Sequence, residues 1–277
     1  MNSKMNSDKE NYMKLKLLMD EYTDKDVMVA FSGGVDSSLL LKMACDIASK
    51  KGNKVYAVTL HTMLHPLNEL ENAQKVAEEV GAIHFIIQVD ELQNAGILQN
   101  PPDRCYRCKK YLFEEVKKKA SELHVDTIMD GTNESDLHVY RPGIKAIQEL
   151  GIVSPLAKSG ITKAEVRQLA AEYGISVSDR PSAPCLATRF PYGTSLSHEK
   201  MDMVEKGEVY IKAFGIYNVR LRVHGEIARI EVDEPDIDKI LTHKEEIITY
   251  LKNLGYAYIT IDLEGFRSGS MDVNLKL

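Results

Sequence analysis

The sequence lacks the features that would assign it to several classes of protein. Its longest apolar runs are only strand-sized, and residues 1–16 are polar and charged, so we expect neither a transmembrane span nor a secretory signal. Four cysteines in 277 residues are too few for a disulfide scaffold. A net charge of −6 gives no overall basic surface for long nucleic-acid contacts. We therefore expect a cytoplasmic globular protein without membrane or nucleic-acid partners.

Over the first two-thirds of the chain, short apolar runs alternate with stretches of helical periodicity. Strands are predicted at residues 27–31, 54–60, 84–89 and 127–129, with helices between them. Thr162 and Glu165 have the spacing of a capping box and predict one more helix start. This alternation indicates an α/β fold with a parallel sheet that binds ligands at the carboxyl ends of its strands.

The pattern changes near residue 195. Ser197 can cap a helix that reaches about Phe214, and two strands, 218–224 and 227–232, flank a two-residue turn. A helix over 236–254 and a strand over 258–263 are predicted to follow. We expect a parallel-sheet domain over residues 1–190 and a smaller α+β domain over 195–277, joined by the Pro- and Gly-bearing segment 180–193.

A candidate phosphate loop lies between the first predicted strand and its helix. Backbone N–H groups at a helix N-terminus attract anions, glycines let phosphates approach the main chain, and serine hydroxyls add donors. These positions are Ser32, Gly33, Gly34, Asp36, Ser37 and Ser38. Asp36 could hold Mg²⁺ between phosphates. The loop has neither the lysine of a Walker A motif nor the GxGxxG spacing of a dinucleotide site, and an ordinary Gly-rich turn is the alternative.

The complete string SGGVDS after a strand resembles the PP-loop of the ATP pyrophosphatase superfamily. The resemblance implies a loop that grips the β- and γ-phosphates of ATP and leaves the α-phosphorus open to attack, with AMP and pyrophosphate as products. Asp130, Gly131 and Thr132, with Asn133, form a second PP-loop-like feature at the end of the fourth strand. A simple Asp-Gly turn is the alternative there.

Three of the four cysteines could carry chemistry. Cys105 and Cys108 form a CxxC pair placed just before a helix expected to begin near Lys110, and Cys185 lies in the interdomain segment. Cys45 falls on the apolar side of the first helix and is expected to be inert. A redox pair, a structural zinc site and a three-thiolate [4Fe–4S] cluster with one open iron all remain compatible with this spacing.

Arg220 and Arg222 are two positions apart on a predicted strand and therefore share a face. Paired guanidinium groups can bind a phosphate or a carboxylate. A solvated face neutralised by neighbouring acidic residues is the alternative.

Taken together, the later motifs make the chain resemble the LarE-type family of ATP-dependent sulfur transferases, which build the nickel-pincer nucleotide cofactor. The strings that carry the resemblance, besides the PP-loop and 130–133, are 140–143, Cys185 with 188–194, 219–222 and 265–269. It implies that a pyridinium biscarboxylate mononucleotide is adenylated and that sulfur displaces AMP, giving thiocarboxylates. On this basis Asp36 and Cys185 are catalytic, Arg141 joins the nucleotide site, and Arg220 and Arg222 hold the substrate's phosphate.

The sulfur source is where this sequence departs from part of that family. Some LarE-like proteins give up the sulfur of one cysteine, at the position of Cys185, whereas others carry an additional CxxC and are thought to use a cluster. We expect the cluster type, with ligands Cys105, Cys108 and Cys185, in a homo-oligomer supplied by inorganic sulfide or a sulfur-donor protein. A tRNA thiolase, an amide-forming synthetase and a non-catalytic ATP sensor are the alternatives.

Overall fold

The computed structural model describes residues 2–64, 68–139, 141–178, 184–267 and 269–271. They form two compact units, each made of separate stretches of the chain. Unit 1 consists of Met1–Thr62, Leu67–Ala95 and Asp103–Ala183, and unit 2 of Met63–Pro66, Gly96–Pro102 and Pro184–Leu277. The domain limits at 190 and 195 stay a prediction.

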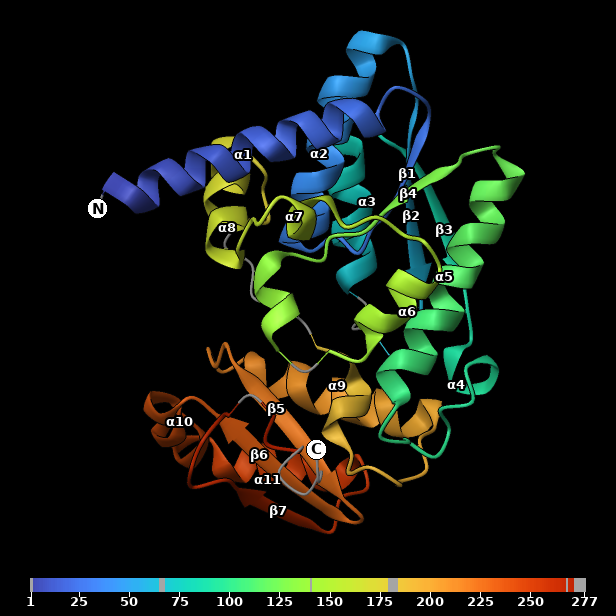
Figure 1. The fold of residues 1–277 in the computed structure, drawn as a ribbon. Helices are drawn as coiled ribbons and strands as arrows, with labels where there is room; N and C mark the ends of the chain where they lie inside the picture. Colours follow the sequence, from blue (N-terminus) through green and yellow to red (C-terminus); the bar gives the residue numbers. More distant parts are fainter. Residues whose placement is uncertain (1, 65–67, 140, 179–183, 268, 272–277) are drawn as a thin grey trace. The chain divides into compact units, whose positions relative to one another are not determined.

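Unit 1 is built on a four-stranded parallel sheet of order β3-β2-β1-β4 (Figure 1). Its strands are β1 (Val27–Ala30), β2 (Val55–His61), β3 (Ile83–Gln88) and β4 (Thr127–Met129). Its α-helices are α1 (Asn2–Tyr22), α2 (Val35–Lys51), α3 (Asn68–Val80), α4 (Glu91–Asn94), α5 (Arg104–Glu122), α6 (Gly143–Glu149), α7 (Pro155–Lys158) and α8 (Lys163–Glu172), and η1 (Glu134–His138) is a 3₁₀ turn. The predicted α/β class and its parallel sheet are confirmed.

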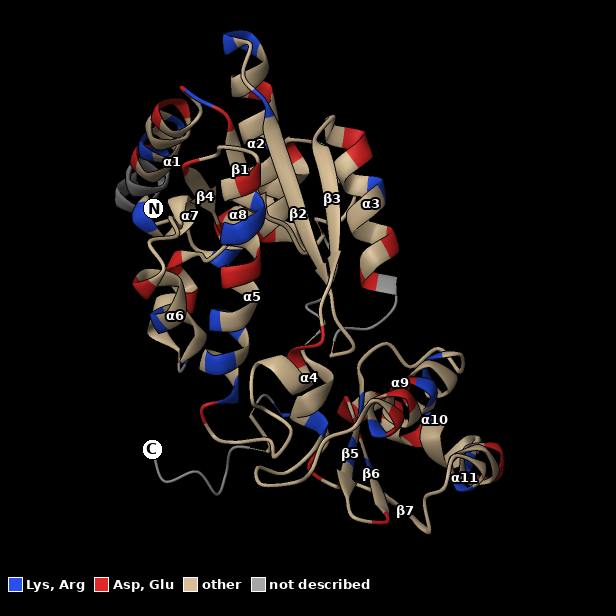
Figure 2. Ribbon diagram, turned by 90° about the vertical axis from the view of Figure 1, so that its right-hand side faces the viewer, with Lys and Arg blue, Asp and Glu red and all other residues tan. Residues whose placement is uncertain are grey.

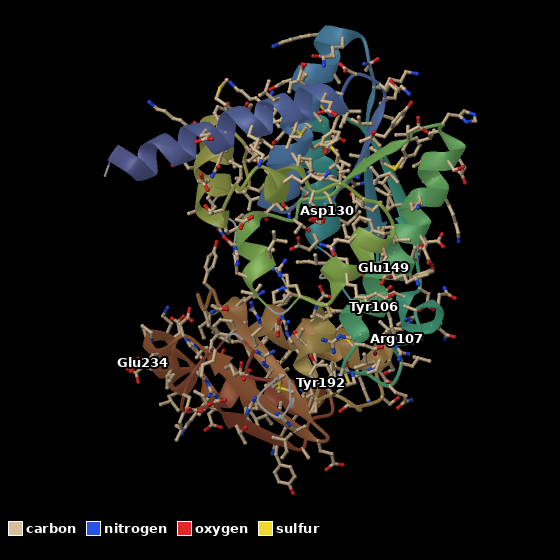
Figure 3. All side chains as sticks on the ribbon, in the orientation of Figure 1. Tyr106, Arg107, Asp130, Glu149, Tyr192 and Glu234 are labelled. Atoms are coloured by element: carbon tan, nitrogen blue, oxygen red, sulfur yellow. The ribbon has the colours of Figure 1, made fainter. Side chains whose placement is uncertain are left out.

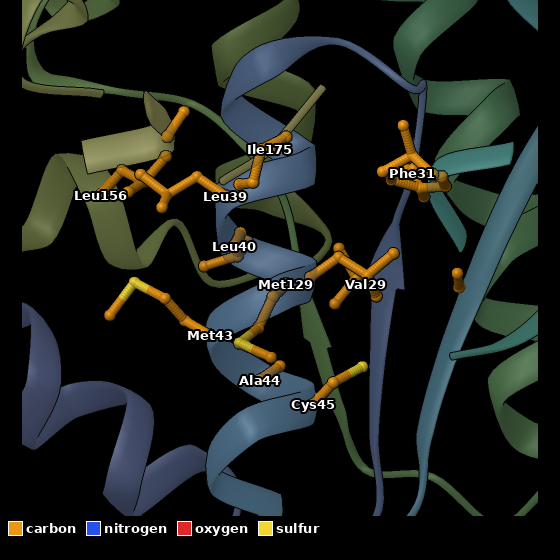
Figure 4. Packing of buried hydrophobic residues seen from close by; sticks show 14 of the residues in the cluster. Val29, Phe31, Leu39, Leu40, Met43, Ala44, Cys45, Met129, Leu156 and Ile175 are labelled. Carbon is orange, nitrogen blue, oxygen red and sulfur yellow. The ribbon is translucent and has the colours of Figure 1, made fainter. Parts of the chain in front are cut away.

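Side chains alternate between the two faces of this sheet, and each face has its own helices. Val27 and Val29 of β1 pack with α1, α2, α3 and α8, whereas Met28 between them packs with α5 and α6. Figure 4 shows part of the first of these cores: Leu39 and Leu40 lie on the side of α2 toward Leu156, and Cys45 lies on its side toward β1. Covering both faces is what a parallel sheet requires, and it leaves the carboxyl ends of the strands for the loops.

Unit 2 contains a three-stranded sheet of order β5-β6-β7, with β5 (Val219–His224) and β6 (Ile227–Val232) antiparallel and β7 (Tyr258–Ile261) parallel to β6. Its α-helices are α9 (His198–Lys212), α10 (Ile237–Thr242) and α11 (Lys244–Asn253), and its 3₁₀ turns are η2 (Leu186–Arg189) and η3 (Glu234–Asp236). Gly207 lets α9 approach both β5 and α11, since an added Cβ would lie 2.7 Å from the Leu221 side chain and 3.0 Å from that of Leu251.

Two predicted helix starts are confirmed by their caps. Thr162 and Glu165 form the expected capping box, and the Ser197 side chain accepts from the Lys200 N–H. Two other helix predictions are wrong. The helix expected near Lys110 begins at Arg104, so both CxxC cysteines lie inside α5. The helix expected over 236–254 is divided into η3, α10 and α11, with a break at His243, whose ring stacks on Phe214 at 4.3 Å.

Helix α1 has no counterpart in the sequence-based prediction. Its Leu15 and Met19 are fully buried in the core that contains α2, Val27 and Val29 (from here on the α2 core). Met13 and Leu17 are exposed, so the apolar residues of this helix do not mark one face clearly. None of the helices in the described residues is both long and apolar enough to cross a membrane.

Candidate active site

The glycine loop of unit 1, residues 32–38, follows the carboxyl end of β1 and includes the first turn of α2. Gly33 has φ +73°, and a Cβ there would lie 2.9 Å from the backbone N and Cα of Ala73. Glycine is therefore required twice, for its backbone conformation and for the space. This close approach fixes the loop against α3 and opens α2 with its N–H groups at the sheet edge, as an anion site needs.

Serine hydroxyls line the same loop. The Ser37 hydroxyl donates to the Gly34 carbonyl oxygen at 3.1 Å and lies 3.2 Å from the Ser32 hydroxyl. Ser38 is fully buried, and its hydroxyl has no hydrogen-bond partner among the described residues. A buried polar group without a partner is costly. The loop thus carries hydrogen-bonding capacity that a phosphate group can use.

One carboxylate belongs to the loop and a second stands beside it. Asp36 accepts from Asn133 Nδ2 at 2.9 Å and forms an ion pair with Lys163. Asp130, which is buried, accepts from the Thr132 hydroxyl at 2.5 Å and from the Ser154 hydroxyl. Carboxylate oxygens are the ligands that Mg²⁺ prefers, so this donor set fits the metal that accompanies a nucleotide triphosphate.

Gly131 joins the two motifs that the sequence singled out. A Cβ at Gly131 would lie 2.9 Å from the Ser37 backbone N, so the end of β4 touches the first turn of α2. The structure therefore brings 130–133 and the glycine loop into one site within unit 1. Arg141, the remaining predicted nucleotide contact, pairs with Asp136 at 3.1 Å and is about half exposed.

The CxxC pair occupies the first two turns of α5. Cys105 is exposed and Cys108 is partly buried, and three positions apart on a helix they lie on neighbouring sites of one face. Tyr106 between them donates to Glu149 Oε2 at 2.7 Å (Figure 3). Gly143 lets α6 approach α5 here, since a Cβ would lie 3.3 Å from the Cys105 carbonyl oxygen. Lys and Arg positions recur along α5 (Figure 2).

The third predicted ligand, Cys185, belongs to unit 2, where it precedes the η2 turn. All four cysteines are thiols, and Cys45 is buried in the α2 core, where burial raises its pKa to about 11. Two thiols on one helix face suit thiolate ligation of iron. Within either unit, the described residues hold no group of three or more His, Cys, Asp and Glu arranged around a metal. A three-cysteine site stays a prediction.

A buried ion pair supports the Cys185 turn. Arg189 donates its Nε and Nη2 to Glu208 at 2.7 and 2.9 Å, and its Nη1 to the carbonyl oxygens of Pro184 and Cys185. Both side chains are almost fully buried, at 2% and 5% exposed. Glu208 also accepts from the Leu221 N–H at 2.9 Å. The pair thus ties the turn that carries Cys185 to strand β5.

The two arginines of β5 have different surroundings. Arg222 is buried. Its Nε donates to the Glu231 carboxylate at 2.9 Å, and its Nη1 donates to the Thr188 carbonyl oxygen at 3.0 Å. Arg220 lies over the Phe266 ring at 5.1 Å, and burial, with Arg189 nearby, lowers its pKa. An acidic neighbour, Glu231, therefore neutralises Arg222, but the pair is buried and does not form a solvated face.

Sequence reasoning missed three residues of these networks. Lys163 follows the capping threonine, so its backbone position was predicted but its contact with Asp36 was not. Arg189 lies inside a motif string and Glu208 inside a predicted helix. The sequence has no local signal for their pairing, because 19 positions separate them.

Comparison with known proteins agrees with this geometry. A PP-loop domain family matches residues 7–139. The chain is 38% identical over 262 residues to an uncharacterized protein of Synechocystis, covering 94% of this chain and 97% of that one. It is 38% identical over 249 residues, 90% of each chain, to the pyridinium-3,5-bisthiocarboxylic acid mononucleotide synthase of Lactiplantibacillus plantarum.

A more distant relative is the tRNA-specific 2-thiouridylase of Rickettsia rickettsii, 23% identical over 66% of this chain and 60% of that protein. The identity to the synthase is higher and spans both units, whereas the thiouridylase match leaves a third of the chain uncovered. The glycine loop, its ATP-binding domain and the full-length similarity agree: the chain belongs to the LarE family of PP-loop, ATP-dependent sulfur transferases.

Proposed function

We propose that this enzyme adenylates the carboxylates of a pyridinium-3,5-biscarboxylate mononucleotide and converts them to thiocarboxylates. The observation that carries the proposal is the 38% identity to a synthase named for the bisthiocarboxylic acid product, over 90% of each chain. A carboxylate oxygen attacks the α-phosphorus of ATP, and pyrophosphate leaves. Sulfur then attacks the acyl carbon, and AMP leaves with the oxygen that the carboxylate contributed. Adenylation is needed because a carboxylate oxygen is otherwise a poor leaving group.

The residues of the glycine loop have distinct tasks in the first step. The backbone N–H groups at the start of α2 and the hydroxyls of Ser32, Ser37 and Ser38 bind the β- and γ-phosphates. Asp36 and Asp130 would hold Mg²⁺, which neutralises charge on the departing pyrophosphate. The position of Gly131 against Ser37 supports one shared site for all of these groups.

For the second step we propose that Cys105, Cys108 and Cys185 hold a [4Fe–4S] cluster, which would supply the sulfur. The pair on the first turns of α5 supports this, because two thiolates on one helix face can share a metal centre. Arg189 holds the Cys185 carbonyl oxygen and so fixes the backbone of the third ligand. Inorganic sulfide or a donor protein would restore the sulfur, in a cytoplasmic homo-oligomer.

Arg220 and Arg222 are proposed to bind the phosphate of the mononucleotide. Arg222 already gives hydrogen bonds to Glu231 and Thr188, so we expect Arg220 to carry more of this binding. Substitution Arg220→Met should therefore raise the KM for the mononucleotide more than Arg222→Met does in the fraction that remains folded.

Mass spectrometry of the protein after several turnovers tests the sulfur source. The cluster proposal predicts an intact Cys185 thiol, together with iron and sulfide in anaerobically purified protein that are lost in Cys108→Ser. Stoichiometric conversion of Cys185 to dehydroalanine would contradict it and identify Cys185 as the donor.

A tRNA thiolase is the second candidate, favoured by the similarity to the tRNA 2-thiouridylase. It predicts tRNA binding that weakens steeply with salt, because phosphate contacts release counterions. Pyrophosphate release that depends on tRNA and ignores the mononucleotide would establish this alternative.

A further inference from the structure

A lysine from outside the glycine loop lies on the loop's carboxylate. Lys163 donates its Nζ to Asp36 Oδ2, while Asn133 donates to the other oxygen of the same carboxylate at 2.9 Å. Lys163 and Asp36 are 127 positions apart in the sequence, so the fold of unit 1, rather than local sequence, makes this contact.

The backbone of Lys163 is held firmly, whereas its side chain has room to move. The N–H of Lys163 donates to the Ser135 hydroxyl at 3.1 Å, and Thr162 just before it forms the capping box with Glu165. The Lys163 side chain is 37% exposed. A lysine ammonium on its flexible stem can therefore reach different partners from one fixed backbone position.

The glycine loop needs a cation that it does not contain. Residues 32–38 include one carboxylate and neither lysine nor arginine, yet in the proposed function they bind the triphosphate of ATP. In Walker A loops a lysine within the motif meets the β- and γ-phosphates. Here Lys163 brings a positive charge to the same end of the sheet from the start of α8.

We propose that Lys163 is a nucleotide-binding residue that contacts the triphosphate of ATP and rests on Asp36 when no nucleotide is bound. Lys163 and Mg²⁺ are then alternative partners of the Asp36 carboxylate. The Asp36–Lys163 pair is partly exposed at both ends, so it is easily opened, and a lysine–phosphate hydrogen bond is charge-assisted. The inference rests on the ATP use of the proposed function, and it is independent of the acid substrate and the sulfur donor.

Calorimetric titration with ATP and with AMP, in Mg²⁺ and in EDTA, tests the proposal. In Lys163→Met the Kd for ATP should rise about 10- to 100-fold in both media, with the Kd for AMP within about twofold of the wild-type value. Lys163→Arg should restore most of the ATP affinity. The matched control is Lys42→Met, which removes another ion-paired, partly exposed lysine, bound to Asp46 at 2.6 Å on α2, and should leave ATP binding unchanged.

A second variant separates direct contact from support of Asp36. In EDTA, Asp36→Asn should tighten ATP binding, because it releases Lys163, and the gain should vanish in Asp36→Asn with Lys163→Met. Loss of ATP affinity in Lys163→Met only when Mg²⁺ is present would overturn the proposal, since Lys163 would then merely orient Asp36. Equal losses of affinity for ATP and AMP in Lys163→Met, or a Kd for ATP in that variant equal to the wild-type value, would overturn it as well. If the wild-type protein bound no ATP, the proposed function would fail with it.

Discussion

The polar groups near the glycine loop of unit 1 and those behind Cys185 in unit 2 are organised in opposite ways. Asp36 and Lys163 are 21% and 37% exposed, whereas Arg189 and Glu208 are 5% exposed or less. Exposed pairs contribute little to stability and exchange partners readily, while removing one member of a buried pair leaves a charge in the interior. We therefore expect the Asp36–Lys163 pair to change partners and the Arg189–Glu208 pair to keep one arrangement.

The largest loss of stability is expected when the buried Arg189–Glu208 pair is broken. Glu208→Ala leaves the Arg189 guanidinium buried without its carboxylate and removes the acceptor of the Leu221 N–H, so it should cost about 3–5 kcal/mol of unfolding free energy. Lys163→Met, which breaks the partly exposed pair and leaves Asp36 bound to Asn133, should cost no more than about 1 kcal/mol. Urea denaturation of both variants measures the difference, and similar losses would contradict the contrast between the two regions.

An intermediate effect is expected at the glycine loop. Gly33→Ala should destabilise the protein by about 1–3 kcal/mol more than Gly52→Ala and should weaken ATP binding. Both glycines have positive φ, but a Cβ at Gly52 meets nothing within 4 Å, whereas one at Gly33 meets the Ala73 backbone. The Gly52 variant thus isolates the cost of conformation from that of the clash. Equal melting temperatures for the two variants would show that the close approach to α3 is unimportant.

The last prediction needs no substitution and leaves the fold intact. It compares the alkylation rates of two thiols of unit 1, Cys105 and Cys45. At pH 8, iodoacetamide should label the exposed Cys105 at least about a hundredfold faster than Cys45, because the Cys45 thiol is buried and its raised pKa of about 11 leaves little thiolate. Peptide mass mapping of metal-free protein over time gives both rates. Labelling of Cys45 at a comparable rate would show that the α2 core opens readily.

The sequence was sufficient where local patterns decide the structure. The apolar runs of β1 and β2 and the capping box of Thr162 mark their elements directly, because burial of strands and satisfaction of helix N–H groups depend on neighbouring residues. The parallel sheet followed from the alternation of predicted strands and helices, and the family followed from the motif strings.

The rest depends on contacts between distant residues. The α10–α11 break is accompanied by the stacking of His243 on Phe214, and α1 is fixed by burying Leu15 against α2. Likewise, Lys163 meets Asp36 only once β1, β4 and α8 share one sheet edge. No local pattern contains this information, so these features could be seen only in the folded chain.

Adenylation of a carboxylate is tested most directly by following its oxygen. Mononucleotide labelled with ¹⁸O in both carboxylates should be converted with ATP and a sulfur source while the AMP is analysed by mass spectrometry. The proposed chemistry predicts one ¹⁸O atom in each AMP and one pyrophosphate for each thiocarboxylate formed. AMP without the label, or ADP and phosphate in place of AMP and pyrophosphate, would contradict it.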